Sequence, residues 1–382
     1  MIKELCPKGV ERVKLETLLD YEQPTKYIVV STEYDNTYTT PVLTAGQSFI
    51  LGYTNEERGV YKASPQNPVI IFDDFTTGFH WVDFDFKVKS SAMKMLKPKS
   101  NENDFRYIYM AMNTIIFVPS NHTRHWITIF SKFEIPLPPL SVQREIVSVL
   151  DSFTSLIDKM KQEVEMRKRQ MEYYREKLMT FEEGECEWKT LGRCITNLRT
   201  GLNPRVHFKL NTPDADGYYI TVRELKGFRI EPDEKTDRIN KAAIQRINER
   251  SNLQIGDILF SGTGTIGRTA YVDKLPNNWN IKEGIYALTP NKEILNSIFL
   301  IHYFMSSRFM DKIMQRVDGA IVRSIPMAEF RNILIPIPPL PVQRRIVDTL
   351  DTFEAYITKM ERLIALRQKQ YEYYRERLLT FA

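Results

Sequence analysis

The residues from Phe260 to Gly267, Phe-Ser-Gly-Thr-Gly-Thr-Ile-Gly, could form a loop that binds a phosphate or a cofactor. Their spacing fits the G-x-G-x-x-G pattern of dinucleotide-binding loops and the Phe-x-Gly-x-Gly of adenine methyltransferases. Both kinds of site need a helix directly after the glycines, whose N-terminus faces the ligand. The residues that follow, Arg268 to Val272, are strand-like, which disfavours a cofactor site. Two interpretations remain open: a structural hairpin, or a loop whose small residues let the backbone and Arg268 approach DNA.

Two other patterns have the residue types of a metal or catalytic site but are incomplete. Asp214, with Glu224 and Lys226 downstream, has the spacing of a metal-dependent nuclease signature, yet Asp214 lies in a turn-like run. His122 and His125 have no Cys or carboxylate at the spacing of a metal site, so we expect no metal. The sequence contains no Walker motif, no Asn-Pro-Pro-Tyr/Phe and no Gly-x-Ser-x-Gly. No convincing catalytic set remains.

Basic and polar residues gather in segments that we expect to be loops or strand ends. Lys and Arg bind phosphates, whereas Arg, Asn, Gln, Ser and Thr read base edges. Ordinary solvent exposure explains each residue alone, but the set favours DNA. In the first half, Tyr53 and Thr54 rest only on an analogy between Gly52-Tyr53-Thr54 and the glycine loop. The candidate DNA-binding residues are Tyr53, Thr54, Lys87, Lys89, His122, Arg124, His125, Arg199, Arg205, Arg223, Ser261, Thr263, Thr265, Arg268, Lys282 and Arg323.

The net charge of the chain does not by itself indicate a nucleic-acid partner. The 382 residues carry a formal charge of +5. Residues 1–134, 135–181, 182–334 and 335–382 carry −1, +1, +3 and +2, so no part is strongly basic. Binding to DNA must therefore be argued from particular residues.

The composition is that of an ordinary folded protein with two or three domains, since 12% of the residues are aromatic and 26% are charged. No apolar run approaches the roughly 18 residues of a membrane span, and the N-terminal residues lack an apolar signal region. Cys6, Cys186 and Cys194 form no paired framework. We expect reduced thiols and a cytoplasmic location.

A long repeat must position these candidates. Residues 135–181 recur as residues 335–381, and 26 of the 47 aligned residues are identical. Each copy starts with Ile-Pro-x-Pro-Pro-Leu, which is followed by about 40 residues with almost no Pro or Gly and with apolar residues every three or four positions, the pattern of a long helix. The seam residues are Val142, Ile146, Phe153, Ile157, Met160, Tyr174, Leu178, Phe181, Val342, Ile346, Phe353, Ile357, Met360, Tyr374, Leu378 and Phe381.

Each seam is about 60 Å long, at 1.5 Å per residue, and cannot be buried by its own helix. The residues between the two helices would form a compact domain about 40 Å wide. Parallel helices would place the two ends of that domain about 60 Å apart, whereas antiparallel helices bring them together. We therefore expect an antiparallel coiled coil with a globular domain beside each end, in a pseudo-two-fold arrangement. The alternative is two helices that pack separately in a larger bundle.

The globular halves mix short β-like runs with helices, so we expect an α+β fold. In the first half, strands are expected at residues 27–31, 48–51, 68–72, 81–89 and 126–130, with a helix at 103–112. In the second half, strands are expected at residues 218–223, 257–261 and 269–272, with a helix at 295–315. Outside the long helices the sequences of the two halves have diverged.

The paired Ile-Pro-x-Pro-Pro-Leu-x-Val-Gln-Arg segments, the paired Tyr-Tyr-Arg-Glu-x-Leu-x-Thr-Phe ends and Trp188-Lys-Thr-Leu-Gly closely resemble the specificity subunits of type I restriction-modification systems. The resemblance covers the whole chain. It implies target recognition domain 1 at residues 1–140, conserved helix 1 at 141–181, target recognition domain 2 at 182–340 and conserved helix 2 at 341–382.

The resemblance also implies a non-catalytic role. Each recognition domain would read one half of a bipartite sequence in double-stranded DNA, while the helices set the distance between half-sites and dock two methyltransferase subunits. S-adenosylmethionine would be bound by those partners and not by this chain, and restriction-translocase subunits would join the complex. The alternatives are a metal-dependent nuclease or DNA methyltransferase in its own right, or a coiled-coil adaptor without DNA contact.

Overall fold

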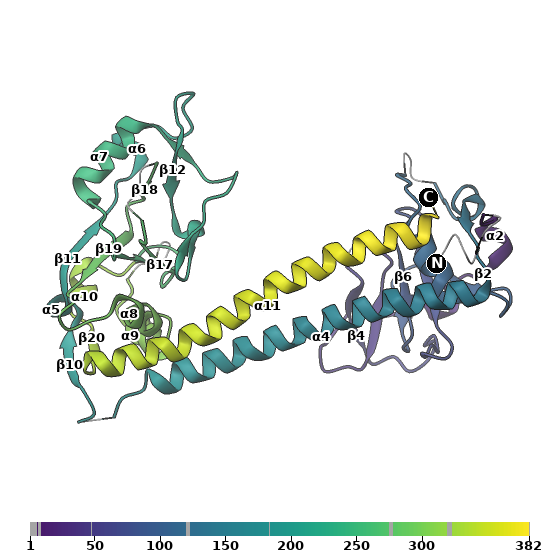
Figure 1. Ribbon diagram of the computed structural model, residues 1–382, viewed down its shortest axis with the longest axis horizontal. Helices are drawn as coiled ribbons and strands as arrows, with labels where there is room; N and C mark the ends of the chain where they lie inside the picture. The colour runs from purple at the N-terminus through teal and green to yellow at the C-terminus, as the bar shows by residue number, and fades with distance from the viewer. Residues whose placement is uncertain are drawn as a thin grey trace. The chain divides into compact units, whose positions relative to one another are not determined.

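The computed structural model describes residues 6, 9–46, 48–119, 123–182, 184–274, 278–318 and 323–381. The chain separates into two compact units, which are described one at a time. Unit 1 comprises Met1–Lys161 and Arg362–Ala382, and unit 2 comprises Gln162–Glu361. Each unit contains a globular part and one segment of each of two long helices, α4 (Leu140–Leu178) and α11 (Leu340–Thr380) (Figure 1).

The two long helices pack against each other in opposite directions. In unit 1, Phe153 of α4 stacks on Tyr374 of α11 with ring centroids 5.5 Å apart. In unit 2, Tyr174 of α4 stacks on Phe353 of α11 at the same distance of 5.5 Å. A later position on α4 thus meets an earlier position on α11, as antiparallel packing requires. The expected antiparallel pair is confirmed. The two contacts are equivalent, because Phe153 and Phe353, like Tyr174 and Tyr374, occupy the same position of the repeat.

The expected seam residues are buried or half-buried, except Tyr374, which is 37% exposed, and they do not all face the partner helix. Ile157 and Ile357 are almost fully buried, and Met160 and Met360 are half-buried. At the helix ends the seam continues into the globular cores instead. Val142, Ile146, Leu378 and Phe381 pack in the core of unit 1, and Leu178, Phe181, Val342 and Ile346 pack in the core of unit 2.

A buried glutamine fastens the start of each long helix to its globular part. The side chain of Gln143 accepts a hydrogen bond from the backbone N–H of Asp104 at 2.8 Å. It also donates to the side chain of Asn103 at 2.9 Å and to the carbonyl of Pro138 at 2.8 Å. Gln343 makes the matching contacts with Asn296, Ile294 and Pro338, all at 2.8 Å.

Unit 1 is built on two sheets. The first has the strand order β2-β8-β5-β6 and is antiparallel; the second has the order β4-β3-β7, in which β3 and β7 are parallel. These strands are β2 (Leu19–Glu22), β3 (Thr40–Leu43), β4 (Ile50–Thr54), β5 (Val69–Asp73), β6 (Phe79–Val82), β7 (Lys87–Val88) and β8 (Met93–Pro98). The remaining elements are β1 (Arg12–Lys14), α2 (Leu15–Leu18), η1 (Thr25–Tyr27), α3 (Phe105–Met112), η2 (Phe130–Lys132) and β9 (Glu134–Pro136).

Unit 2 repeats this topology although its sequence differs. Its sheets have the orders β11-β19-β16-β17 and β15-β12-β18, with β12 and β18 parallel. These strands are β11 (Ile195–Thr200), β12 (Gly217–Ile220), β15 (Arg238–Ile239), β16 (Ile258–Ser261), β17 (Thr269–Tyr271), β18 (Trp279–Ile281) and β19 (Ile285–Pro290). Its other elements are β10 (Glu187–Thr190), α5 (Leu191–Cys194), α6 (Pro204–His207), η3 (Val222–Glu224), β13 (Leu225–Lys226), β14 (Arg229–Ile230), α7 (Lys241–Ser251), α8 (Ser297–Phe304), α9 (Ser307–Met314), α10 (Met327–Arg331) and β20 (Leu334–Ile337).

The mixed α+β class is confirmed, but several expected elements differ. The single strand expected at residues 81–89 is divided between β6 and β7, which belong to different sheets. The prediction failed because an alternation of apolar and polar residues is the same for one strand as for two strands in different sheets. Residues 126–130 form turns and the start of η2 instead of a strand. The helix expected at 295–315 is two helices, because the Ser306 side chain caps a new helix by accepting from the N–H of Phe309. No helix among the residues described is long and apolar enough to cross a bilayer.

Candidate nucleic-acid interface

The glycine-rich segment after Phe260 forms the connection of a β-hairpin between β16 and β17. The Ser261 hydroxyl donates to the carbonyl of Thr265 at 2.7 Å and accepts from the N–H of Arg268 at 2.8 Å, which closes the connection. Strand β17 follows almost directly in the chain, so the helix that both cofactor motifs require after the glycines is not formed there. The dinucleotide and methyltransferase patterns therefore lack their helix. The segment connects the two strands of a hairpin, and an approach of its backbone and Arg268 to DNA stays a prediction.

Backbone hydrogen bonds tie this hairpin to two other segments of unit 2. Gly262 donates to the carbonyl of Gly284 at 2.8 Å and accepts from the N–H of Ile325 at 2.9 Å. Gly264 donates to the carbonyl of Arg323 at 2.8 Å. Gly262 cannot be replaced without disturbance, because an added Cβ would lie 2.3 Å from the ring of Tyr286. We call this meeting point of three segments the loop node.

A cleft of about 740 Å³ opens beside the loop node of unit 2. It brings together three of the predicted residues, Arg205, Thr263 and Lys282, although they come from distant parts of the chain. Thr265, Arg268 and Arg323 are exposed on the segments of the node itself. The other lining residues are Thr200, Asn203, Pro204, Leu210, Tyr219, Thr221, Asp237, Arg250, Glu283, Gly284, Tyr286, Ser324 and Met327. This surface offers cations for phosphates, with hydroxyl and amide groups for base edges.

Unit 1 contains the same loop node, built from unrelated residues. The backbone N–H of Asp74 donates to the carbonyl of Ala92 at 2.8 Å, as the N–H of Gly262 does to the carbonyl of Gly284. The backbone carbonyl of Asp74 accepts from the N–H of His125 at 2.8 Å, as the carbonyl of Gly262 accepts from the N–H of Ile325. The segment before His125 carries Arg124, which is exposed. His122 lies outside the described residues.

Lys89 and Lys282 occupy the same place in the two units. Each is the first residue after the parallel strand of the smaller sheet, and each is exposed. The N–H of Lys89 donates to Leu43 at 3.0 Å, and the N–H of Lys282 donates to Ile220 at 2.9 Å. Because Leu43 and Ile220 end β3 and β12, the two lysines stand at equivalent strand ends beside equivalent nodes.

The analogy between Gly52-Tyr53-Thr54 and the glycine loop is wrong. Tyr53 and Thr54 lie in β4, which corresponds to β15, and Thr54 pairs with Thr40 at the end of β3 away from Leu43. Thr54 is also buried, with 1% of its surface exposed. The counterpart of the glycine loop is the connection between β5 and β6, which includes Asp74.

Two of the predicted cations are buried in ion pairs and do not face solvent. Lys87 lies 2.6 Å from the carboxylate of Glu56, and the hydrogen bond from Lys87 lowers the pKa of Glu56 against the opposing effect of burial. Arg199 lies 2.6 Å from the carboxylate of Asp257 and donates to the hydroxyl of Thr289 at 2.7 Å. Because each charge is paired inside the protein, Lys87 links β7 to the segment after β4, and Arg199 links β11 to β19 and to the residue before β16. Thr54, Lys87, His125, Arg199 and Ser261 are all buried, which disfavours the predicted DNA contacts of these five residues.

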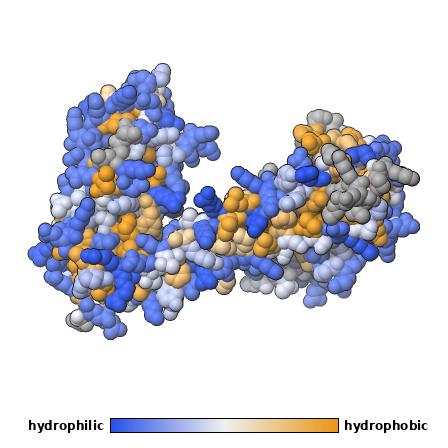
Figure 2. Space-filling view, viewed as in Figure 1, coloured by the Kyte–Doolittle hydropathy of each residue, from blue (hydrophilic) through white to orange (hydrophobic). Residues whose placement is uncertain are grey.

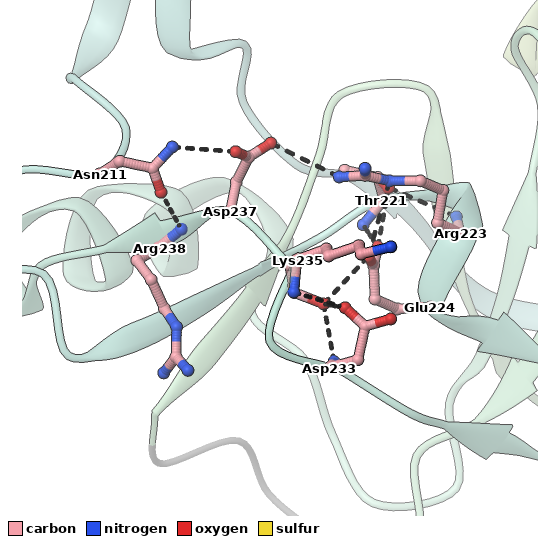
Figure 3. A network of polar contacts seen from close by, with 9 residues as sticks. Asn211, Thr221, Arg223, Glu224, Asp233, Lys235, Asp237 and Arg238 are labelled. Carbon is pink, nitrogen blue, oxygen red and sulfur yellow. Dashed lines mark hydrogen bonds and ion pairs between the residues drawn. The ribbon is translucent and has the colours of Figure 1, made fainter. Parts of the chain in front are cut away.

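The acidic residues of the possible nuclease site, Asp214 and Glu224, have structural partners, and Figure 3 shows those of Glu224. The buried carboxylate of Glu224 accepts from the N–H and hydroxyl of Thr221, both at 2.7 Å, and from the hydroxyl of Thr236 at 3.2 Å. Hydrogen bonds from Thr212 and Asn240 lower the pKa of Asp214, which is exposed. Glu224 is thus the third residue of a capping box at the start of η3, in which Thr221 is the N-terminal cap. No group of three or more His, Cys, Asp or Glu suited to a metal occurs in the described part of the chain.

The polar network of Figure 3 continues to the edge of the cleft. Arg223 is exposed but lies 3.6 Å from the carboxylate of Asp237, a cleft residue. Sequence analysis missed two further arginines nearby. Arg250 lines the cleft and lies 3.5 Å from the carboxylate of Glu283, and the guanidinium of Arg238 lies 3.9 Å from the ring centre of Tyr218. The position of Arg250 in the last turn of α7 gave no signal, because a basic residue is common there.

Comparison with known proteins assigns the chain to a family. The family described as "Type I restriction modification DNA specificity domain" matches residues 3–166 and again residues 209–368. The chain belongs to this family of DNA specificity subunits. It is 39% identical to the EcoR124I/EcoR124II specificity subunit of Escherichia coli over 97% of this chain and 94% of that protein. It is 40% identical to the EcoprrI specificity subunit of E. coli over 54% of this chain and 53% of that protein.

The fold agrees with this assignment. A crystal structure of a type I restriction-modification S subunit from M. genitalium matches with a TM-score of 0.57 at 14% sequence identity, covering 97% of this chain and 96% of that one. Members of the family are the non-catalytic specificity subunits of type I restriction-modification complexes. The loop nodes of this specificity subunit are therefore candidate surfaces for contact with DNA.

Proposed function

We propose that the chain reads a bipartite DNA sequence, one half-site with the loop node of each unit. The observation that carries this proposal is the repetition of the node in two units whose sequences differ. A shared backbone frame with different side chains suits two readers of different sequence. Exposed cations at the frame, Lys89 and Arg124 in unit 1 and Arg205, Lys282 and Arg323 in unit 2, would bind phosphates on either side of the bases that are read.

The proposed recognition of a DNA sequence can be tested by selection from random duplex DNA. The chain is co-purified with its modification subunits, and the bound DNA is recovered after electrophoresis and sequenced. The expected pool contains two short specific blocks separated by a fixed unspecified gap. Replacing residues 182–340 by those of a relative should then change one block only. A pool without a motif would refute DNA reading and favour a coiled-coil adaptor.

The cations can be tested separately from the reading of bases. Lys89→Gln and Lys282→Gln should each weaken binding to all sequences about equally. Each should also reduce the slope of log affinity against log salt concentration by about 1, because one phosphate contact is lost. Lys14→Gln is the matched control, since Lys14 is exposed on β1, in a separate sheet from the node. Equal salt slopes in all four proteins would contradict the phosphate contacts.

The proposal extends to the long helices, which would set the distance between half-sites and dock two methyltransferase subunits, with restriction-translocase subunits joining the complex. Figure 2 shows apolar side chains exposed along the helices on the visible face. Exposed apolar residues recur at equivalent positions of the two helices: Leu156 and Tyr356, Met166 and Leu366, and Tyr173 and Tyr373. Such recurrence fits two similar partners.

Two experiments test the role of the helices. Lengthening α4 and α11 by equal whole turns should widen the gap between the selected blocks, and an unchanged gap would exclude the spacing role. The double variant Tyr173→Ser, Tyr373→Ser should reduce the amount of modification subunit that co-purifies, because two exposed apolar contacts are removed. Gln368→Ala, on an exposed position of α11, is the control.

A further inference from the structure

The connection between β5 and β6, residues 73–78, lies at the loop node of unit 1 but contains none of the residues predicted to bind DNA. Its place is that of the glycine loop in unit 2, because Asp74 makes the two backbone hydrogen bonds that Gly262 makes there. The neighbouring segments on either side of it carry the exposed cations Lys89 and Arg124. We call residues 73–78 the β5–β6 turn.

The β5–β6 turn is held in one conformation from several sides. The Asp73 carboxylate accepts from the N–H groups of Phe75 and Thr76, both at 2.8 Å. The Asp74 carboxylate accepts from the N–H of Trp126 at 3.0 Å. An added Cβ on Gly78 would lie 2.5 Å from the carbonyl oxygen of Ala45, so the turn also packs closely against the loop between β3 and β4.

The backbone of the turn is strained at its buried residue. Thr77 has a φ of 58°, in the left-handed region that β-branched residues rarely adopt. Its side chain is buried and donates to the carbonyl of Thr76 at 2.7 Å. Strain of this kind is typical of segments that present a side chain for binding. The strain and the two aspartates leave Thr76 exposed at the tip of the turn.

We infer that Thr76 contacts a base edge in the half-site read by unit 1, with Lys89 and Arg124 on the flanking phosphates. This inference rests on the proposed DNA-reading function. A threonine on a rigid turn can donate or accept one hydrogen bond at a base edge, and its methyl group can contact the methyl group of thymine. Thr76 replaces Tyr53 and Thr54 as the specificity residue of unit 1, and it is the counterpart in place of Thr263 and Thr265 in unit 2.

The test compares the selected DNA of Thr76→Ala, Thr76→Val and wild type, each in complex with the modification subunits. Thr76→Ala should lose about tenfold preference at one base pair of a single half-site, and the other half-site should stay unchanged. Thr76→Val should behave like Thr76→Ala if the hydroxyl reads the base, and like wild type if the methyl group does. Thr39→Ala changes an exposed threonine just before β3, at the end of that strand away from the node, and should leave the motif unchanged.

Three outcomes would overturn the inference. A Thr76→Ala motif identical to that of wild type would show that Thr76 touches no base. Equal weakening for all sequences would assign Thr76 to the DNA backbone. A change in both half-sites would show a general effect on the fold. By contrast, a wild-type pool with no split motif would refute the proposed function itself, so the two failures are distinguishable.

Discussion

Gln343 offers a direct measurement of how firmly a globular part is fastened to its long helix. Its side chain is fully buried and satisfies three backbone groups, the N–H of Asn296 and the carbonyls of Ile294 and Pro338, each at 2.8 Å. Gln343→Ala leaves these groups without their partner. Each buried unsatisfied group costs roughly 1–3 kcal/mol. Since water can enter the space and satisfy part of them, we expect the free energy of unfolding of unit 2 to fall by about 3 kcal/mol.

Gln343→Glu keeps the shape of the side chain and separates the loss of hydrogen bonds from the loss of packing. It places an oxygen where the amide nitrogen faces two carbonyls, so at neutral pH we expect a loss at least as large as for alanine. Urea denaturation gives the free energy of unfolding. Hydrogen exchange of peptides from α8 and β20 shows whether unit 2 is the part affected.

The control is Gln368→Ala, an exposed glutamine on the same helix, which should change the free energy of unfolding by no more than about 0.5 kcal/mol. If Gln343→Ala were as stable as this control, the buried amide would not fasten the helix to the globular part. If the exchange of α8 peptides stayed slow, the loss would lie elsewhere in the chain.

Further predictions concern the buried charges and the helix pair. Arg199→Ala should lower the free energy of unfolding by about 3–5 kcal/mol, because Asp257 stays buried without its partner, and the added change Asp257→Leu should recover part of the loss in urea denaturation; an unchanged stability with an altered DNA motif would return Arg199 to the DNA contacts. Burial, followed by the nearby charge of Arg175, lowers the pKa of His302 to about 3 from 6.5. Between these two pH values His302 takes up a proton only in the unfolded chain. The free energy of unfolding therefore falls by about 1.4 kcal/mol for each pH unit below about pH 6.5. His302→Leu should flatten that part of the pH profile, and an equally steep profile would contradict the burial of a neutral imidazole. Phe153→Ala should cost about 2–3 kcal/mol by removing the contact with Tyr374, whereas Tyr173→Ala, at an exposed position, should cost little in the same assay.

The sequence alone determined the long helices, their antiparallel packing and the family. These features depend on order along one chain: a 47-residue repeat and apolar residues every three or four positions. The elements of the globular parts were less predictable. The alternation from Trp81 to Lys89 suited one strand, but the chain divides it between two sheets with separate cores. Only the tertiary structure showed that the two diverged halves share one topology.

The surface that would meet DNA was decided by contacts between residues far apart in the sequence. Lys87 and Lys89 are the same residue type two positions apart, yet Lys87 is buried and paired with Glu56, whereas Lys89 is exposed. Arg199 lies beside Asp257, 58 residues away, whereas Arg205 reaches the cleft. A sequence pattern indicates which side chains can bind a phosphate, but burial and pairing determine which charges remain free, and both depend on the folded chain.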